Sequence, residues 1–310
     1  MESVDSSLKR LGNTEHFLTF QKTDLEQFVH EARSLNLRIA VVTSGGTTVP
    51  LEQRAVRFID NFSTGTRGAT STEKFLDLGS VDNTSGDPWR KKYAVVFLTR
   101  EGSKQPYLRK VSAQHIAEAC EILASQVTVR DKSIVTALTS WKTTRSRLFV
   151  IYFTTVQQYL ADLFSIAQTV KPYRRSVLFF LAAAVSDYYV PFDQLSAHKI
   201  QSDTEDLVLN LQRVPKCLGS LRHDWAPEAF VASFKLETDE SLLMGKARGA
   251  LAKYNMHCVI GNVLDNRYEE VLIIDKKGKK LLQKGSGNEE LETVLVSEIA
   301  RMHEQYSKNG

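Results

Sequence analysis

Short, continuous runs of apolar residues alternate along the chain with longer segments in which apolar residues recur at helical spacing. The continuous runs predict buried strands at residues 38–43, 94–98, 148–153, 177–183, 230–234 and 258–262. The spaced segments predict helices, the clearest of which are residues 67–78, 156–170, 240–254 and 289–306. Strands that alternate with helices form a mostly parallel sheet with helices on both faces, so we expect a doubly wound, Rossmann-like α/β fold.

Two segments depart from this alternation. Residues 271–275 and 279–283 read as a hairpin, which predicts an antiparallel edge to the sheet. The polar stretch 187–213 predicts a projecting β-flap. We expect one domain over 1–310, with a polar N-terminal arm at 1–20 and a surface insertion at 80–92, where turn-forming residues gather.

Composition narrows the function only a little. Of the 310 residues 42% are hydrophobic and 25% are charged, which is ordinary for a globular protein. The net charge of +4 comes from scattered basic residues, so nucleic-acid binding is not indicated. The three cysteines lack the spacing of a disulfide framework or a zinc site, and no stretch is a signal sequence or a membrane span. We therefore expect a cytoplasmic protein that binds neither nucleic acid nor a membrane.

Two turns carry the candidate chemistry. The first, at residues 60–69, joins a polar loop to a helix start through two glycines, where bare backbone N–H groups can bind phosphate oxygens. The second, at residues 181–188, ends a buried strand in small side chains followed by a carboxylate, which leaves room for a ligand against the backbone. Together they predict a nucleotide and a smaller substrate that meet in one crevice.

The familiar nucleotide and hydrolase motifs are missing. The chain contains neither G-x-G-x-x-G nor G-x-x-x-x-G-K-[ST], and no tyrosine has a lysine four residues later. A P-loop NTPase is therefore not indicated, and a nicotinamide-dependent reductase survives only as an analogy of fold. G-x-S-x-G and H-E-x-x-H are also absent, so esterase and zinc-protease readings have no support.

Five blocks in order resemble the phosphopantothenoylcysteine synthetase family, in its eukaryotic stand-alone form. The blocks are TSGGT with FIDNFSTG at 43–65, AAAVSDYYVP at 182–191, HKIQS at 198–202, SFKLET at 233–238 and GN at 261–262. The resemblance implies a ligase of coenzyme A biosynthesis that joins 4′-phosphopantothenate to L-cysteine through an acyl-nucleotide intermediate. It also implies a homodimer with shared active sites, in which residues 187–213 serve as flap and dimerisation region.

The implied co-substrates are a nucleoside triphosphate and Mg²⁺. Many bacterial members carry a lysine where this chain has Tyr254, before Asn255-Met256-His257, and the bacterial type prefers CTP. We therefore expect ATP rather than CTP. Thr66 stands where some relatives carry a basic residue, which removes one possible phosphate contact. No all-protein metal site is evident, which suits a Mg²⁺ held largely by phosphates and water.

The resemblance also assigns roles to polar residues that would otherwise look ordinary. By position alone Asn61 is a turn residue, but the resemblance implies that its carboxamide binds the substrate carboxyl and the acyl intermediate. Lys199 would be a solvated lysine and is implied to close over the nucleotide as part of the flap. Arg57 would be a surface arginine and is implied to reach the neighbouring subunit's site, where it binds the substrate phosphate.

Binding residues follow in the same way. The pantothenate moiety is implied to contact Ala183, Ala184 and Asp187, which from the residues alone could be a packing pair and a turn cap. The nucleotide is implied to contact Gly45, Ser63, Gly65, Gly68, Phe234 and Asn262. Glycines of turns, a core phenylalanine and a strand-end asparagine are the alternatives. A relative that has lost catalysis and serves as an interaction subunit is the rival function, although Asn61, Lys199 and the glycines argue against it.

Overall fold

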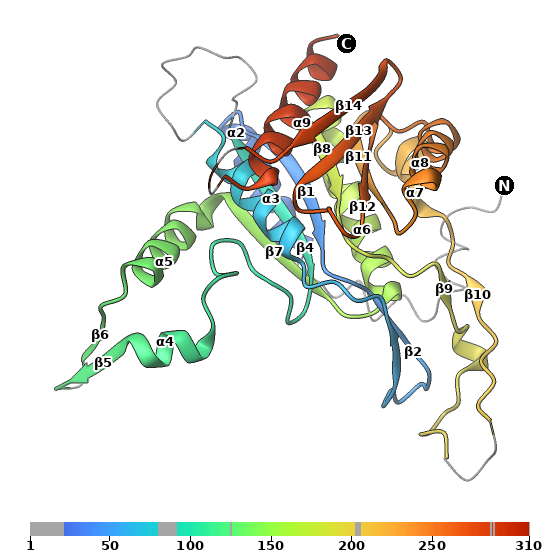
Figure 1. The fold of residues 1–310 in the computed structure, drawn as a ribbon, viewed down its shortest axis with the longest axis horizontal. Coiled ribbons are helices and arrows are strands. Elements are labelled where there is room, and N and C mark those ends of the chain that lie inside the picture. The colour runs from blue at the N-terminus through green and yellow to red at the C-terminus, as the bar shows by residue number, and fades with distance from the viewer. Residues whose placement is uncertain are drawn as a thin grey trace.

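The computed structural model describes residues 22–79, 92–124, 126–201, 206–285, 287 and 289–309. The expected N-terminal arm at 1–20 lies outside the described residues, and so does nearly all of the expected insertion at 80–92. One large sheet organises the described residues, and helices lie on both of its faces (Figure 1).

The sheet confirms the predicted class of fold. In the described part of the chain it has eight strands in the order β14-β13-β12-β11-β8-β1-β4-β7. Six of them run parallel: β1 (Arg38–Ser44), β4 (Tyr93–Arg100), β7 (Leu148–Phe153), β8 (Val177–Leu181), β11 (Phe230–Glu237) and β12 (Cys258–Val263). The antiparallel edge is β13 (Glu270–Asp275) and β14 (Gly278–Gln283). The chain moves outward from β1 in one direction and then in the other, so the direction reverses between β1 and β8.

Continuous apolar runs become the central strands because both faces of the sheet are covered. All seven residues of β1 and all five of β8 are buried. One core cluster lies under α2 (Lys22–Ser34), α6 (Val156–Val170) and α8 (Glu240–Tyr254). The other lies under α3 (Thr66–Asp77) and α9 (Leu291–Lys308). Because the central strands are buried on both faces, the positions of their ends are well defined. The loops expected to bind ligands begin at these ends.

Local signals set where several helices begin and end. Helix α6 starts in a capping box. The Thr155 side chain accepts from the Gln158 N–H, and the Gln158 side-chain oxygen accepts from the Thr155 N–H. Helix α8 begins at Asp239, whose carboxylate accepts from the N–H of Ser241. It ends at Asn255 in the left-handed conformation (φ 48°), which an asparagine tolerates well.

Two short hairpins project from the carboxyl-terminal edge of the parallel strands. One pairs β2 (Thr48–Pro50) with β3 (Phe58–Asp60), and the other pairs β9 (Tyr188–Tyr189) with β10 (Gln212–Arg213). Both extend downward from the sheet in Figure 1. The second confirms the predicted flap over 187–213, although only its base is paired as strands among the described residues.

A third projection was not predicted. Helices α4 (Ala113–Ala119) and α5 (Lys132–Thr144) flank a hairpin of β5 (Cys120–Leu123) and β6 (Gln126–Val129), and this arm extends away from the sheet (Figure 1). Helix α4 buries none of its residues, so it has no apolar stripe from which a sequence pattern could predict it.

Some predicted boundaries were wrong. The strand predicted at 177–183 ends at Leu181, because Ala184 forms an isolated parallel bridge with Gly46 instead. The strands predicted to end at Phe234 and Asn262 continue to Glu237 and Val263, since backbone pairing between β11 and β12 outlasts the apolar run. Among the described residues, no helix combines the length and the apolar character that a membrane crossing requires.

Candidate functional site

The loops that follow β1 and β8 meet at the point where the strand order reverses. Thr47 N–H donates to Ala184 O at 3.0 Å, and Ala184 N–H donates to Gly45 O at 2.8 Å. The N–H of Ala183 donates to the hydroxyl of Thr43 at 3.1 Å. The predicted substrate residues Ala183 and Ala184 therefore lie at the crevice, but both of their N–H groups are already used within the chain. What they offer a ligand is the small size of their side chains and the carbonyl of Ala183.

Asn61 is held against this junction by the Thr47 carbonyl oxygen and the Ser186 hydroxyl. Its N–H donates to Thr47 O at 3.1 Å, and its Oδ1 accepts from the Ser186 hydroxyl at 3.1 Å. Ser186 is placed in turn by its own N–H, which donates to Thr47 Oγ1 at 2.9 Å. With Oδ1 accepting from Ser186, the Asn61 amide nitrogen keeps both of its protons for a partner outside this network.

Neither Thr47 nor Ser186 was predicted as a site residue, although each stands within a block that resembles the family. Both side chains are buried. A buried hydroxyl requires a hydrogen-bond partner; here the Thr47 hydroxyl donates to Ser186 Oγ at 3.3 Å, and the Ser186 hydroxyl donates to Asn61 Oδ1. A polar residue just beyond the end of a buried strand was the available signal.

The predicted phosphate loop leads into α3. Ser63 Oγ accepts from the N–H of Gly65 at 3.3 Å, and the Ser44 hydroxyl donates to Gly65 O at 2.9 Å. No side chain caps the start of α3, so the N–H groups of its first turn are not occupied by a cap. The positive end of the helix dipole lies at the same place, which favours an anion.

Two glycines of the site are required by close approach within the protein itself. A Cβ on Gly68 would lie 2.4 Å from the Ser44 Cβ, and a Cβ on Gly46 would lie 1.6 Å from Asn61 O. Either contact would force the backbone apart. Gly68 therefore allows α3 to pack against β1, and Gly46 allows Asn61 to approach the loop after β1.

Phe234 lies beside the start of α3. Its ring meets that of Phe180 edge-on, with centroids 5.0 Å apart. The Arg67 guanidinium stands 5.6 Å from the Phe234 ring and 3.1 Å from the Glu292 carboxylate. Arg67 thus joins the phosphate loop to the predicted base-binding ring. Sequence reasoning missed it as a site residue, because an arginine in a first helical turn is ordinarily solvated.

Asn262 is one of several buried polar residues that have an atom without a hydrogen-bond partner among the described residues. It lies on β12 opposite Leu236 of β11 and is 7% exposed. Its Oδ1 has no hydrogen-bond partner among the described residues. An unpaired buried carbonyl oxygen costs on the order of 1–3 kcal/mol, a cost that a ligand donor would remove. This agrees with the predicted nucleotide contact at Asn262.

Arg57 has two partners in its own chain. Its guanidinium donates to Glu52 Oε1 at 2.9 Å and to Ile200 O at 3.1 Å. Burial alone would raise the pKa of the Glu52 carboxyl, but hydrogen bonds from the backbone of Arg57 and Val56 and from the Arg57 side chain lower it below the ordinary value. Glu52 was not predicted to matter. It anchors the β2–β3 hairpin to the flap through Arg57.

Lys199 and Asp187 lie on the flap and are exposed. Lys199 precedes Ile200, so the contact of Arg57 with Ile200 O places Lys199 next to the β2–β3 hairpin. Asp187 O accepts from Val214 N–H at 2.9 Å, which closes the base of the flap. Tyr254, by contrast, ends α8 at the opposite edge of the sheet, so it can mark a subfamily but cannot contact a nucleotide at this site.

Neither a metal cluster nor a reactive thiol emerges from the described residues. They contain no group of three His, Cys, Asp or Glu side chains placed to hold an ion. Burial raises the pKa of the Cys217 thiol to about 12, and burial likewise raises the pKa of Cys258. Both are buried and protonated at neutral pH, as expected of small apolar core residues.

Comparisons with known proteins agree on one family. The family described as the DNA/pantothenate metabolism flavoprotein C-terminal domain matches residues 114–303. Phosphopantothenate–cysteine ligase 2 of Oryza sativa is 40% identical over 86% of this chain and 81% of its own length. Phosphopantothenate–cysteine ligase CAB2 of Saccharomyces cerevisiae is 37% identical over 91% of this chain and 81% of its own. A solved structure of a Cab2 mutant in complex with phosphopantothenate-cysteine has a TM-score of 0.81 and 35% identity, covering 94% of this chain and 95% of that one.

The close approach at Gly68 can be tested by stability. Gly68→Ala should lower the free energy of unfolding by about 1–3 kcal/mol, because the new methyl group overlaps Ser44. Gly249→Ala is the matched control, since nothing lies within 4 Å of its Cβ position in the exposed face of α8. That variant should gain about 0.5–1 kcal/mol from the better helix former. Denaturant unfolding measures both, and a Gly68→Ala protein as stable as Gly249→Ala would contradict the packing.

Proposed function

The chain belongs to the phosphopantothenate–cysteine ligase family, and we propose that it joins 4′-phosphopantothenate to L-cysteine in coenzyme A biosynthesis. The observation that carries the proposal is the fixed carboxamide of Asn61 at the reversal point of the sheet. Its oxygen is held by Ser186 and its nitrogen is left to donate. A carboxylate is activated by groups that bind its oxygens without reacting with them, and an amide N–H donor is such a group.

The proposed reaction has two steps. In the first, a carboxylate oxygen of 4′-phosphopantothenate attacks the α-phosphorus of ATP, the bond to the β-phosphate breaks, and pyrophosphate leaves. In the second, the cysteine amine attacks the acyl carbon of the acyl-adenylate, AMP leaves with the bonding electron pair, and the amine loses a proton. Asn61 donates to the acyl oxygen in both steps. In the first it holds the carboxylate in place, and in the second it stabilises the negative charge that grows on that oxygen as the amine attacks.

The nucleotide is assigned to the α3 side of the crevice. Uncapped N–H groups at the start of α3 would receive phosphate oxygens near Gly65 and Ser63. The unpaired Oδ1 of Asn262 would accept from an amino or hydroxyl group of the nucleoside, and Phe234 would line its apolar face. Mg²⁺, when bound, offsets the charge of the transferring phosphates; with no carboxylate cluster in the described residues, phosphates and water would supply most of its ligands.

The direct test supplies the purified protein with 4′-phosphopantothenate, cysteine, Mg²⁺ and either ATP or CTP. We expect release of pyrophosphate and formation of the phosphopantothenoylcysteine product with ATP, and slower turnover with CTP. Omitting cysteine should still allow exchange of labelled pyrophosphate into ATP, because the adenylate forms first. Product without pyrophosphate release would contradict the adenylate route, and no product with either nucleotide would favour a relative that has lost catalysis.

The role of Asn61 can be separated from that of its support. Asn61→Asp places a negative charge against an anionic intermediate, so we expect ligation to fall by about 10²-fold or more with the fold intact. Ser186→Ala leaves the donor in place but frees its orientation, so a smaller loss of about 10-fold is expected. Lys199→Gln should slow adenylate formation as the flap loses its cation. Lys216→Gln, a charge change at an exposed lysine near the flap base, is the control and should keep full activity. Full activity of Asn61→Asp would sink the assignment.

We further propose that a second copy of the chain covers the two projecting hairpins. Large apolar side chains on these hairpins are 39–79% exposed: Val56, Phe58, Tyr188, Leu207, Val208 and Leu211. Monomeric proteins rarely expose so many apolar residues in one region. The family resemblance indicates that a second copy of the chain covers this surface, because it implies active sites that are completed across a two-fold axis. Arg57 lies at this surface, and its side chain is 39% exposed.

Solution size tests the dimer. Light scattering of the unaltered protein should give the mass of two chains. Val208→Asp should give one chain and lose most of its ligase activity, because Val208 is 79% exposed and would carry a charge into the interface. Leu35→Asp is matched for exposure, at 69%, but lies beyond the end of α2 and should stay dimeric and active. A fully active monomer would contradict the shared site.

A further inference from the structure

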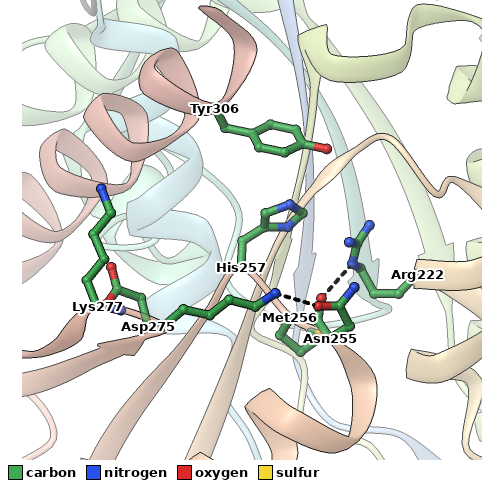
Figure 2. A pocket seen from close by; sticks show the side chains of 8 residues that line it. Arg222, Asn255, Met256, His257, Asp275, Lys277 and Tyr306 are labelled. Carbon is green, nitrogen blue, oxygen red and sulfur yellow. Dashed lines mark hydrogen bonds between the residues drawn. The ribbon is translucent and has the colours of Figure 1, made fainter. Parts of the chain in front are cut away.

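A second hollow lies on the opposite edge of the sheet, where β12 begins and α9 ends. It is a cavity of about 300 Å³, and its walls include Arg222, Asn255, His257, Asp275, Lys276 and Tyr306 (Figure 2). These residues come from the helical segment Leu221–Trp225 that follows α7 (Cys217–Ser220), the end of α8, the start of β12, the end of β13 with the turn after it, and the last helix. The candidate ligase site is at the carboxyl ends of the parallel strands, so the two sites are on opposite edges.

Arg222 is a buried cation without a carboxylate partner. It is 9% exposed, and its donors go to carbonyl oxygens: Nε to Asn255 O at 3.0 Å, and Nη1 to Pro227 O at 2.6 Å. No ion pair joins it to an acid in the described part of the chain. Carbonyl oxygens orient a guanidinium but leave its charge uncompensated, and a buried charge is costly unless it is paired. The second terminal nitrogen, Nη2, has no recorded partner in these residues and remains a donor.

His257 adds a second donor to the cavity. Its Nδ1 accepts from the N–H of Val231 at 3.0 Å, which places the ring proton on Nε2. Burial, together with the positive charges of Arg222, Lys276 and Arg175, lowers the pKa of His257 to about 3. The ring is therefore neutral and donates from Nε2. The same cations that disfavour an imidazolium favour an anion.

Lys276 closes the cavity from the β13–β14 turn. Its ammonium donates to Asn255 Oδ1 at 2.8 Å. Asp275 is the one carboxylate of the lining, and its Oδ1 accepts from the N–H groups of Lys277 and Gly278 at 2.8 and 2.9 Å. The Asp275 carboxylate is thus hydrogen-bonded within the turn. The lining also contains three cations, Arg222, Lys276 and Lys277, so its net charge is positive.

We propose that this cavity is a binding site for the phosphate group of a small molecule. Donors approach from three separate segments, through the Arg222 guanidinium, the His257 Nε2–H and the Lys276 ammonium. A tetrahedral dianion has enough oxygens to accept from all three at once, which a planar carboxylate does less well. The volume holds a phosphate with a small substituent. The site stands apart from the ligase reaction and does not depend on it.

Calorimetric titration with inorganic phosphate, in a phosphate-free buffer, tests the site directly. We expect one phosphate per chain at this site, with a Kd on the order of 1 mM or tighter. Lys276→Gln should weaken this binding by about 10-fold, the typical loss for one charge-assisted hydrogen bond. Lys279→Gln removes the same charge from the same hairpin, outside the lining, and should bind as the parent does.

A local readout separates this cavity from the phosphate loop of the ligase site. The His257 ring resonance, followed by NMR of histidine-labelled protein, should shift with phosphate and saturate at the same Kd. Arg222→Gln should abolish the shift, provided that circular dichroism shows a folded protein. If that variant is not folded, Lys276→Gln is used in its place and should weaken the phosphate-dependent shift. Phosphate binding that leaves His257 unmoved, equal binding by the Lys276→Gln and Lys279→Gln variants, or no binding by the parent protein would each overturn the proposal.

Discussion

The backbone pairing of β1 with β8 continues past the ends of both strands, and the candidate site depends on that continuation. Past the end of each strand, Ala184 N–H donates to Gly45 O and Thr47 N–H donates to Ala184 O. The Thr43 hydroxyl, still within β1, accepts from the N–H of Ala183. Because β1 and β8 are buried throughout, the loops leave the core at a fixed separation. Thr47 then serves both Asn61 and Ser186, so the orientation of one carboxamide is set by the centre of the sheet.

Several residues of the site have both an expected contact with a ligand or a neighbouring subunit and a packing role within their own chain, and the sequence does not distinguish the two. Gly45 and Gly68 are implied by the family resemblance to contact the nucleotide, yet each also approaches its own chain more closely than a side chain would allow. Arg57 resembles a residue that reaches a neighbouring subunit, and it also ties the β2–β3 hairpin to the flap through Glu52 and Ile200. A residue of this kind shapes the site before any ligand binds.

The sequence could predict the strands and the reversal point because apolar runs and small-residue turns are local signals. It predicted the loop that carries Asn61 for the same reason, whereas the role of Asn61 was implied only by the family resemblance. It could not predict the arm of α4, β5, β6 and α5, since α4 buries nothing and leaves no periodic pattern. The end of β11 was missed because Lys235 breaks the apolar run while backbone pairing to β12 goes on. The cavity around Arg222 and His257 joins segments far apart in sequence, and an isolated arginine or histidine gives no sign of that.

The position of β1 in the middle of the sheet has a consequence for how the protein is made. Its two neighbours are β4 at Tyr93–Arg100 and β8 at Val177–Leu181, and Asn262 comes later still. A ribosome adding roughly 5–20 residues per second leaves β1 waiting several seconds for β8. Until then one edge of a strand that is buried along its whole length in the folded protein has no partner, a condition that favours aggregation. The partly made chain therefore has reason to need a chaperone, and its crevice is complete only after Asn262 has been made.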